Sequence, residues 1–301
     1  MDLDKVFNAL SGSIKDVRRN EPMAAHTSFK VGGCADIMVL PGSADEVQHV
    51  LLTARSTETP LYVMGRGTNM LVTSKGIRGI VMKLADNFSG VEIDGDCVTA
   101  KSGTSLAELV QEAMEKSLGG AEFLGGIPGT VGGAVCMNAG AYGGEIGDFV
   151  EEVAFATPAG VLTLNNTEMN FGYRRSILSS LPLIVTGVKL RLISCDREES
   201  LQKLCALNEQ RRLKQPLEYP SAGSTFKRPE GGYAGTMIDQ AGLKGLRIGG
   251  AEVSQKHAGF VINSGNATPE EIIALIEEVQ KRVFAHCGVK LEPEVRIVGE
   301  R

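Results

Sequence analysis

Glycine-rich segments are the part of this sequence best suited to chemistry, and the longest of them spans residues 119–144. Ten of its 26 residues are glycine, and the residues between them are mostly apolar, unlike those of a polar Gly/Ser linker. Glycine concentrates where the backbone must adopt a positive φ, or where a ligand approaches the main chain too closely for a Cβ. We interpret the segment as a buried loop whose exposed amides bind an anionic phosphate group. The alternative is a tight corner between strands that binds no ligand.

A second glycine-containing loop, GRGTNML at 65–71, directly follows an expected strand. Neither loop has the G-x-G-x-x-G pattern of dinucleotide-binding crossovers, because 65–67 lacks a third glycine and 126–133 reads GIPGTVGG. The phosphate-binding pattern G-x-x-x-x-G-K-[ST] is also absent. Two such loops suit one extended ligand that carries phosphates. We therefore expect a nucleotide cofactor, and the mixed strands favour a flavin fold other than the usual dinucleotide-binding one.

Strand and helix patterns surround both loops. We expect a β-α-β unit made of a strand at 36–40, a helix opened by the capping box at 43–46, and a strand at 61–64. Other expected strands lie at 79–84, 91–93, 97–101, 150–157, 161–164, 183–193 and 289–298. Other expected helices lie within the first 25 residues, after the capping box at 105–108, from about 198 to 212, and between Thr268 and Gly288.

Composition excludes several classes of function. The net charge is -5 and no basic run occurs, which argues against a nucleic-acid partner. The six cysteines form no C-x-x-C pair and indicate free thiols in a reducing compartment. The N-terminal residues lack the apolar core of a signal peptide, and no run approaches the ~18 apolar residues of a membrane span. The four histidines are scattered, so we expect no metal site. From the cysteines and the lack of a signal peptide or membrane span, we expect a soluble cytoplasmic protein without a membrane partner.

Six motifs together carry a resemblance to a known family. They are TSFKVGG at 27–33, GRGTNML at 65–71, GIPGTVGGAVCMNAGAYG at 126–143, GYRRS at 172–176, AGSTFKRP at 222–229 and LEPEVR at 291–296. In this order and at this spacing the chain resembles UDP-N-acetylenolpyruvoylglucosamine reductase, the flavoenzyme that makes UDP-N-acetylmuramate for bacterial peptidoglycan. Each motif alone is weak, but six in register are specific.

The resemblance implies an α+β fold in two parts. An FAD-binding domain of the vanillyl-alcohol-oxidase type would occupy residues 1–195, with α+β subdomains at roughly 1–84 and 85–195. A separate α+β substrate-binding domain would occupy 196–301, and the polar segment at 194–200 supports this boundary. FAD would be bound non-covalently, because no histidine matches a flavin-tethering position, although His26 lies near one glycine loop. The FAD-binding residues implied by the two loops are Gly65, Arg66, Gly67, Thr68, Asn69, Gly126, Ile127, Pro128, Gly129, Thr130, Gly132, Gly133, Asn138, Ala139, Gly140 and Tyr142.

The resemblance also implies a two-stage reaction. NADPH, the hydride-donating co-substrate, reduces FAD and leaves; hydride then passes from flavin N5 to the methylene carbon of UDP-N-acetylglucosamine enolpyruvyl ether. The adjacent carbon gains enolate character and takes a proton, for which Ser224 matches the family's donor. Glu294 matches the second catalytic residue, as an acid or as a group that polarises the enol, and Arg174 suits the substrate carboxylate and the enolate charge. Tyr173, Lys214 and Arg228 match substrate-binding positions.

Each catalytic assignment has a structural alternative, and the chain departs from part of the family. Without the resemblance, Ser224 would be a turn cap, Glu294 a surface residue and Arg174 a surface ion pair. A longer subclass inserts a tyrosine-bearing loop after the Y-R-x-S motif, and here Ser176 leads within a few residues to a strand. That tyrosine therefore has no counterpart here, and the sequence does not identify which residue closes the site. Arg66 stands where glycine is common, and it either pairs with a phosphate or points to solvent.

Two other functions compete with the reductase. A sugar or lactone oxidase of the same flavin fold would react with oxygen and need no NADPH. A nucleotide-binding regulatory module would bind its ligand without turnover. The set of Ser224, Glu294 and Arg174 favours the reductase, because an oxidase needs no proton donor to an enolate. Lys227 near Ser224 is a candidate for stabilising the charge that develops on the serine.

Overall fold

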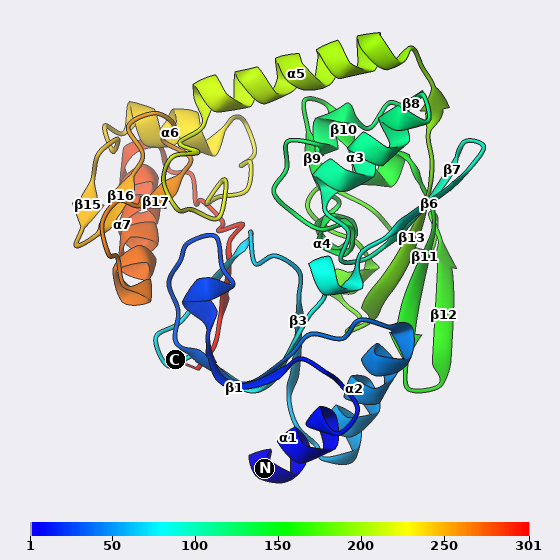
Figure 1. Cartoon of the computed structure of the whole chain (residues 1–301). Helices are drawn as coiled ribbons and strands as arrows, with labels where there is room; N and C mark the ends of the chain where they lie inside the picture. Colours follow the sequence, from blue (N-terminus) through cyan, green and yellow to red (C-terminus); the bar gives the residue numbers. More distant parts are fainter. Residues whose placement is uncertain (1, 301) are drawn as a thin grey trace. The chain divides into compact units, whose positions relative to one another are not determined.

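The computed structural model describes residues 2–300, which divide into two compact units (Figure 1). Unit 1 comprises the chain up to Arg19, Ile37–Arg66 and Gly79–Gln210. Unit 2 comprises Asn20–Asp36, Gly67–Arg78 and the chain from Arg211 onward. The division in the second half of the chain thus falls inside helix α5 (Arg197–Lys214), whereas the expected domain boundary lies at residue 195.

A five-stranded antiparallel sheet is the larger sheet of unit 1, in the order β12-β11-β13-β7-β6 (Figure 1). Its strands are β6 (Val91–Asp94), β7 (Cys97–Lys101), β11 (Val150–Thr157), β12 (Gly160–Asn165) and β13 (Ile184–Arg191). Alternate residues such as Val153 and Phe155 are fully buried, as period-two strands with one core face require. All five strands match strands expected from the sequence.

A second sheet has the order β1-β2-β5-β3, and two short strand pairs, β8 with β14 and β9 with β10, also form. The strands are β1 (Val17–Pro22), β2 (Cys34–Val39), β3 (Leu61–Met64) and β5 (Ile77–Lys83), with the pairs β8 (Leu118–Gly119) and β14 (Ile193–Ser194), and β9 (Gly140–Ala141) and β10 (Gly144–Glu145). Strands β3 and β5 run parallel. The expected strands at 36–40, 61–64 and 79–84 are therefore present, whereas β1 was not expected.

The helices of unit 1 include two that the capping signals predicted. Its helices are α1 (Leu3–Ser11), α2 (Ala44–Ser56), α3 (Leu106–Glu115), α4 (Val131–Met137) and most of α5, with the 3-10 turns η2 (Asp86–Phe88), η3 (Glu122–Leu124), η4 (Ile146–Asp148) and η5 (Ile177–Ser179). The Ser43 and Ser105 hydroxyls accept from the amides of Glu46 and Glu108 and so begin α2 and α3. Within residues 2–300, no helix has the length and apolar character needed to cross a membrane.

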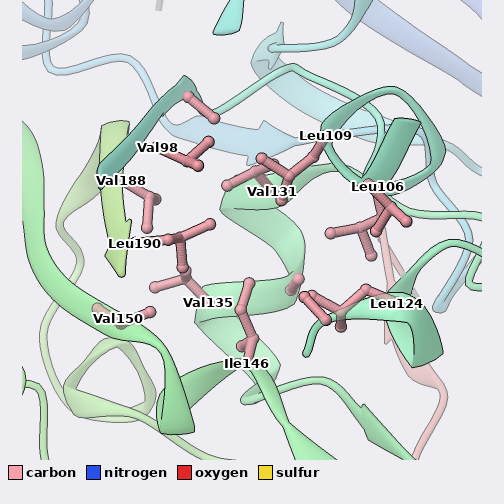
Figure 2. Close-up of a cluster of buried hydrophobic side chains, with 14 of the residues drawn as sticks. Val98, Leu106, Leu109, Leu124, Val131, Val135, Ile146, Val150, Val188 and Leu190 are labelled. Atoms are coloured by element: carbon pink, nitrogen blue, oxygen red, sulfur yellow. The ribbon is translucent and has the colours of Figure 1, made fainter. Parts of the chain in front are cut away.

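Helix α4 lies inside the glycine-rich segment, where the sequence predicted only loop. Thr130 is its N-cap and accepts from the Gly133 amide at 3.3 Å. Figure 2 shows Val131 and Val135 pointing into the main hydrophobic cluster of unit 1, together with side chains from α3 and the five-stranded sheet. Burial of the apolar residues on one helix face offsets the low helix propensity of the glycines.

Unit 2 is built around α7 (Pro269–Cys287) and the antiparallel sheet β15-β16-β17 (Figure 1). Its remaining elements are η1 (Met23–Ala25), β4 (Met70–Val72), α6 (Ala234–Gln240), β15 (Arg247–Ile248), β16 (Ala251–Val253), β17 (Val261–Asn263) and β18 (Arg296–Val298). Phe29, Val31 and Leu71 from the two N-terminal segments belong to its hydrophobic core. Strands β4 and β18 pair in parallel, which joins the end of the chain to residues 70–72.

The ends of α7 agree with the sequence, but the strand expected after it does not. Thr268 and Glu271 form the predicted capping box, and Gly288 ends the helix with a φ of 73°. The predicted strand at 289–298 is wrong in length, because only Arg296–Val298 forms a strand. Pro293 has no N–H to donate, and it forms only an isolated bridge with Phe226.

A buried carboxylate in unit 1 joins η3 to the start of α5. Glu122 is 4% exposed and accepts hydrogen bonds from Ser200 Oγ (2.7 Å), Lys203 Nζ (2.8 Å) and the Gly120 amide (2.9 Å). Burial alone would raise the pKa of Glu122, but these hydrogen bonds outweigh burial and lower the pKa to about 2. Glu122 is thus a charged anchor that holds α5 against the glycine-rich segment.

Replacing Glu122 with glutamine is expected to lower the free energy of unfolding by about 2 kcal/mol at pH 7. The pKa shift alone would give about 3 kcal/mol, but Lys203 is more than half exposed, which weakens the pair. A carboxylate whose pKa is lowered in the folded state stabilises above its unfolded pKa near 4.5, and that contribution disappears as the pH falls toward 2. Thermal unfolding of Glu122→Gln and wild type from pH 7 to pH 2 should therefore show two curves that converge in acid. The exposed Glu115→Gln serves as control, and a pH-independent difference for Glu122→Gln would contradict the assignment.

Candidate active site

The two glycine loops meet within unit 1 at Gly65. A Cβ placed on Gly65 would overlap the hydroxyl oxygen of Thr130, the residue that caps α4. Glycine therefore lets the end of β3 approach the start of α4 more closely than any other residue would. The adjacent Arg66 pairs with Asp86 at 2.6 Å, and both side chains are exposed, that of Asp86 more fully.

The part of the first loop that belongs to unit 2 presents main-chain donors. In residues 2–300, no hydrogen bond engages the amides of Gly67, Thr68 or Asn69. Gly67 has a φ of 65°, a left-handed conformation that is easy for glycine. Successive free amides in such a turn form a concave anion site, so these residues fit a phosphate-bearing cofactor such as FAD.

The first turn of α4 does not present the free amides expected there. The amide of Val131 donates to Thr104 O at 2.9 Å and that of Gly132 to Ser102 O at 2.8 Å. The Gly133 amide donates to the Thr130 hydroxyl. The expectation of exposed amides is therefore wrong for these three residues, because the start of α4 is docked under the turn at 102–104.

The remaining predicted FAD residues of the 126–142 segment connect η3, α4 and β9. Ile127 packs against the hydrophobic core and its amide donates to Leu124 O, while Gly129 O accepts from the Leu106 amide. Gly126 and Pro128 lie in the same connection. Beyond α4, Ala139 is 8% exposed and Gly140 is in β9. Tyr142 is half exposed and its hydroxyl donates to Leu207 O.

Asn138 has a structural task that its sequence motif does not reveal. It ends α4 in the left-handed conformation, with a φ of 44°, and is 2% exposed. Its Nδ2 donates to Gly172 O at 3.2 Å and to Glu145 Oε2 at 2.6 Å, and its Oδ1 accepts from the Gly147 amide at 3.0 Å. The side chain thus joins the end of α4 to the turn that carries Arg174.

Arg174 occupies the tip of a tight turn in unit 1. Gly172 and Arg175 exchange both main-chain hydrogen bonds at 3.1 Å, with Tyr173 and Arg174 between them. Arg174 has a φ of 53°, which costs a residue with a Cβ about 1 kcal/mol or more. Its Nη1 donates to Gly140 O at 3.4 Å, and its guanidinium lies 5.8 Å from the ring of the exposed Tyr173. A strained non-glycine residue held by a well-defined turn is typical of functional sites.

In unit 2, Ser224 and Glu294 are brought together by the main chain. Thr225, next to Ser224, accepts from the Glu294 amide at 2.8 Å and donates its own amide to Gly259 O at 2.8 Å. Both Ser224 and Glu294 are half-buried, which leaves their side chains access to a ligand. Residues distant in the sequence therefore occupy adjacent strand-like segments.

The first glycine loop joins the same hydrogen-bonded network. Asn69 Nδ2 donates to Glu294 O at 3.3 Å, and the Arg296 amide donates to Asn69 O at 3.1 Å. Unit 2 thus places one predicted FAD residue beside a predicted catalytic residue. Arg174 lies in unit 1 and is not part of this network.

The positively charged side chains that the sequence placed near Ser224 or the substrate differ in their contacts. Lys227 forms an ion pair with Glu292, and its amide donates to Glu292 O, so its ammonium group is directed to that carboxylate and not to Ser224. Arg228 is exposed, and its guanidinium lies 4.1 Å from the centre of the Tyr233 ring. Lys214 is exposed at the end of α5.

A neutral histidine supports the loop that binds Thr225. Burial lowers the pKa of His257, and the charge of Lys244 acts in the same direction. The imidazole is therefore neutral at pH 7, and its Nδ1 accepts from the Gly259 amide at 3.1 Å. Gly259 O in turn accepts from Thr225, so His257 holds the Ser224 segment without carrying charge.

Comparisons with known proteins show which families this chain resembles. Residues 35–165 match the FAD binding domain family, and residues 215–298 match the family described as UDP-N-acetylenolpyruvoylglucosamine reductase, C-terminal domain. The chain is 50% identical over 283 residues to UDP-N-acetylenolpyruvoylglucosamine reductase of Caldanaerobacter subterraneus subsp. tengcongensis, covering 94% of this chain and 93% of that protein. It is 49% identical over 285 residues to the protein of the same name from Syntrophomonas wolfei, covering 94% and 95%.

A solved structure gives the same relationship. The crystal structure of UDP-N-acetylenolpyruvylglucosamine reductase from Thermus caldophilus matches 94% of this chain and 98% of that chain, at 37% identity and a TM-score of 0.82. An FAD-binding domain joined to a separate α+β domain is the fold class that the sequence predicted, and these matches confirm it.

Proposed function

This chain belongs to the UDP-N-acetylenolpyruvoylglucosamine reductase family, and we propose that it reduces UDP-N-acetylglucosamine enolpyruvyl ether to UDP-N-acetylmuramate with Ser224 as the proton donor. It is a flavin oxidoreductase of peptidoglycan precursor synthesis, with FAD as its cofactor. The observation that carries the proposal is the hydrogen-bond network of unit 2, which holds Ser224, Glu294 and Asn69 in neighbouring segments.

FAD, when bound, supplies a hydride acceptor for NADPH and a hydride donor for the enolpyruvyl group. The residues that would hold it are those of the two glycine loops, through the amides of Gly67, Thr68 and Asn69 and the close approach of Gly65 to Thr130. The cofactor would be non-covalent.

The protein residues would manage the proton and the substrate's negative charge. Ser224 would give its hydroxyl proton to the substrate carbon next to the carboxylate. A serine hydroxyl is a weak acid, so this transfer requires a strongly basic acceptor held within hydrogen-bond distance. Glu294, held by Thr225 and Asn69, would act as an acid or polarise the enol.

Arg174 would bind the substrate carboxylate and stabilise the enolate charge. A planar guanidinium offers two parallel donors to a carboxylate, which a lysine cannot do. Tyr173, Arg228 and Lys214 would contact the rest of the substrate; all three are exposed. The six free cysteines and the use of NADPH are consistent with a reducing compartment, and we place the protein in the cytoplasm.

NADPH oxidation tests the proposed function. The flavin-loaded protein is mixed with NADPH and UDP-N-acetylglucosamine enolpyruvyl ether, and NADPH absorbance is followed together with dissolved oxygen. We expect NADPH loss that depends on the enolpyruvyl ether, with little oxygen consumption in its absence. Flavin-loaded protein that consumes no NADPH with this substrate would contradict the proposal, and rapid oxygen consumption would favour an oxidase.

A further inference from the structure

Strand β12 at the edge of the five-stranded sheet has one open side. Within residues 2–300 it pairs with β11 alone, and Figure 1 shows it at the border of the sheet. The Asn166 amide donates to Glu151 O at 3.0 Å, and from this bonded pair the register with β11 continues without a shift. Bonded pairs alternate along an antiparallel ladder, so only every second residue of β12 bonds to β11. The residues in between are Val161, Thr163 and Asn165, whose main-chain groups point away from the sheet.

The open part of this edge is bounded by its own chain. The Asn165 amide donates to Glu168 Oε2 at 2.8 Å, and the Asn165 carbonyl accepts from the Met169 amide at 3.0 Å. Asn165 is therefore closed to another strand. In the part of the chain that the structure describes, the residues of β12 whose outward main-chain groups remain unpaired are Val161 and Thr163.

Strand β12 lacks the features that usually prevent edge strands from pairing. No charged residue occurs in 157–167, and β12 itself contains no proline and no bulge. Val161 is 75% exposed and Leu162 39% exposed. By contrast, β6 at the opposite edge of the sheet exposes Glu92 and Asp94, and β1 at an edge of the second sheet carries two arginines and ends in a proline. Protection is thus missing at β12 in particular.

Two copies of β12 are complementary to each other. If they run antiparallel with Leu162 on a two-fold axis, Val161 of each copy lies opposite Thr163 of the other. Residues opposite one another in a bonded pair exchange both main-chain hydrogen bonds, so this register satisfies the open groups of both copies. The two Leu162 side chains then meet at the axis and remove apolar surface from water.

We propose that β12 is the interface of a homodimer, in which two five-stranded sheets join edge to edge through Val161 and Thr163. A second copy fits better than a strand of another protein, because the register matches itself and the uncharged segment offers no charge pattern for a foreign partner. A head-to-tail contact of β12 with β6 would desolvate Glu92 and Asp94 against an apolar strand, which favours a closed dimer over a filament. Two short strands form a small interface, so the dimer should dissociate on dilution.

Sedimentation velocity of the flavin-loaded protein over a concentration series tests the proposal. We expect a monomer–dimer equilibrium for wild type. Leu162→Lys and Leu162→Glu each place two like charges at the axis, and each should raise the dimer dissociation constant about tenfold or more. An equimolar mixture of the two variants should restore the dimer, because opposite charges then face each other.

Two further variants separate the contact from the stability of the strand. Thr163→Pro keeps Leu162 but removes one open N–H, a change that edge strands tolerate, and it should also weaken the dimer. Leu201→Lys alters a leucine of α5 that is 42% exposed, and it should dimerise as wild type does. Melting temperatures of all variants at low concentration should stay near that of the wild-type monomer.

Three results would overturn the proposal. The first is a wild-type monomer at every concentration, and the second is a dimer that neither Leu162 variant weakens. The third is a loss of dimer that mixing the two Leu162 variants does not reverse, since this would indicate a damaged strand and not a broken contact. The outcome does not depend on the reaction that the protein catalyses, so it is distinct from the test of the proposed function.

Discussion

Replacing Ser224 with alanine is expected to lower turnover by about 10²- to 10⁴-fold while NADPH still bleaches the bound flavin. The reason is that a proton donor is needed only after hydride has reached the substrate, so the half-reaction with NADPH does not involve it. The fold should tolerate the change, because the main-chain contacts of this segment are made by Thr225 and not by the Ser224 side chain.

Rapid-mixing measurements separate the two half-reactions. The first mixes oxidised enzyme with NADPH and follows the flavin's visible absorbance. The second mixes reduced enzyme with UDP-N-acetylglucosamine enolpyruvyl ether in the absence of oxygen and follows the return of that absorbance.

Ser221→Ala is the matched control for this experiment. It removes a hydroxyl three residues earlier, where the main chain forms an isolated bridge with Ile262, and both half-reactions should remain near wild type. If Ser224→Ala keeps both half-reactions, Ser224 is not the donor. If it loses the NADPH step as well, the hydroxyl serves cofactor or NADPH binding instead.

Local signals in the sequence were sufficient for most regular elements. Capping residues placed the starts of α2, α3 and α7, and alternating apolar residues placed the strands of the five-stranded sheet. The family motifs nominated Ser224 and Glu294, and the main-chain hydrogen bond from Glu294 to Thr225 now explains why two distant motifs belong together.

What the sequence did not predict depends on long-range contacts. Helix α4 was missed because glycine has low helix propensity, although Val131, Ala134 and Val135 carry the spacing of a buried helix face. The membership of residues 20–36 and 67–78 in unit 2 follows from pairings such as β4 with β18, more than 200 residues apart, for which no local pattern exists. The Asn138 contacts with Gly172 and Gly147 are equally non-local.

Replacing Arg174 with glycine is expected to lower kcat/KM by about 10²- to 10³-fold and to leave the fold as stable as wild type, or more stable by about 1 kcal/mol. The opposite signs follow from the geometry. Arg174 has a φ of 53°, which glycine adopts without strain, while the substrate carboxylate would lose its bidentate donor. If Arg174 served only the turn, Arg174→Gly would instead lower the stability of the fold and leave kcat/KM near the wild-type value.

Arg174→Lys separates the effect of the positive charge from the effect of the planar guanidinium group. Lysine keeps one positive charge but offers no planar pair of donors, so kcat/KM should fall between the values for wild type and Arg174→Gly. Arg175→Ala is the control, because Arg175 is exposed and its hydrogen bonds with Gly172 are made by the main chain, which alanine retains.

Steady-state kinetics and thermal unfolding of the three variants decide the matter together. If Arg174→Gly stays within about fivefold of wild type in kcat/KM, the arginine does not bind the carboxylate of the substrate. If it instead loses stability and Arg175→Ala does not, the guanidinium contact with Gly140 O has a structural role that outweighs the strain of the turn. Only the combination of retained stability and lost activity supports a strained arginine kept for the reaction.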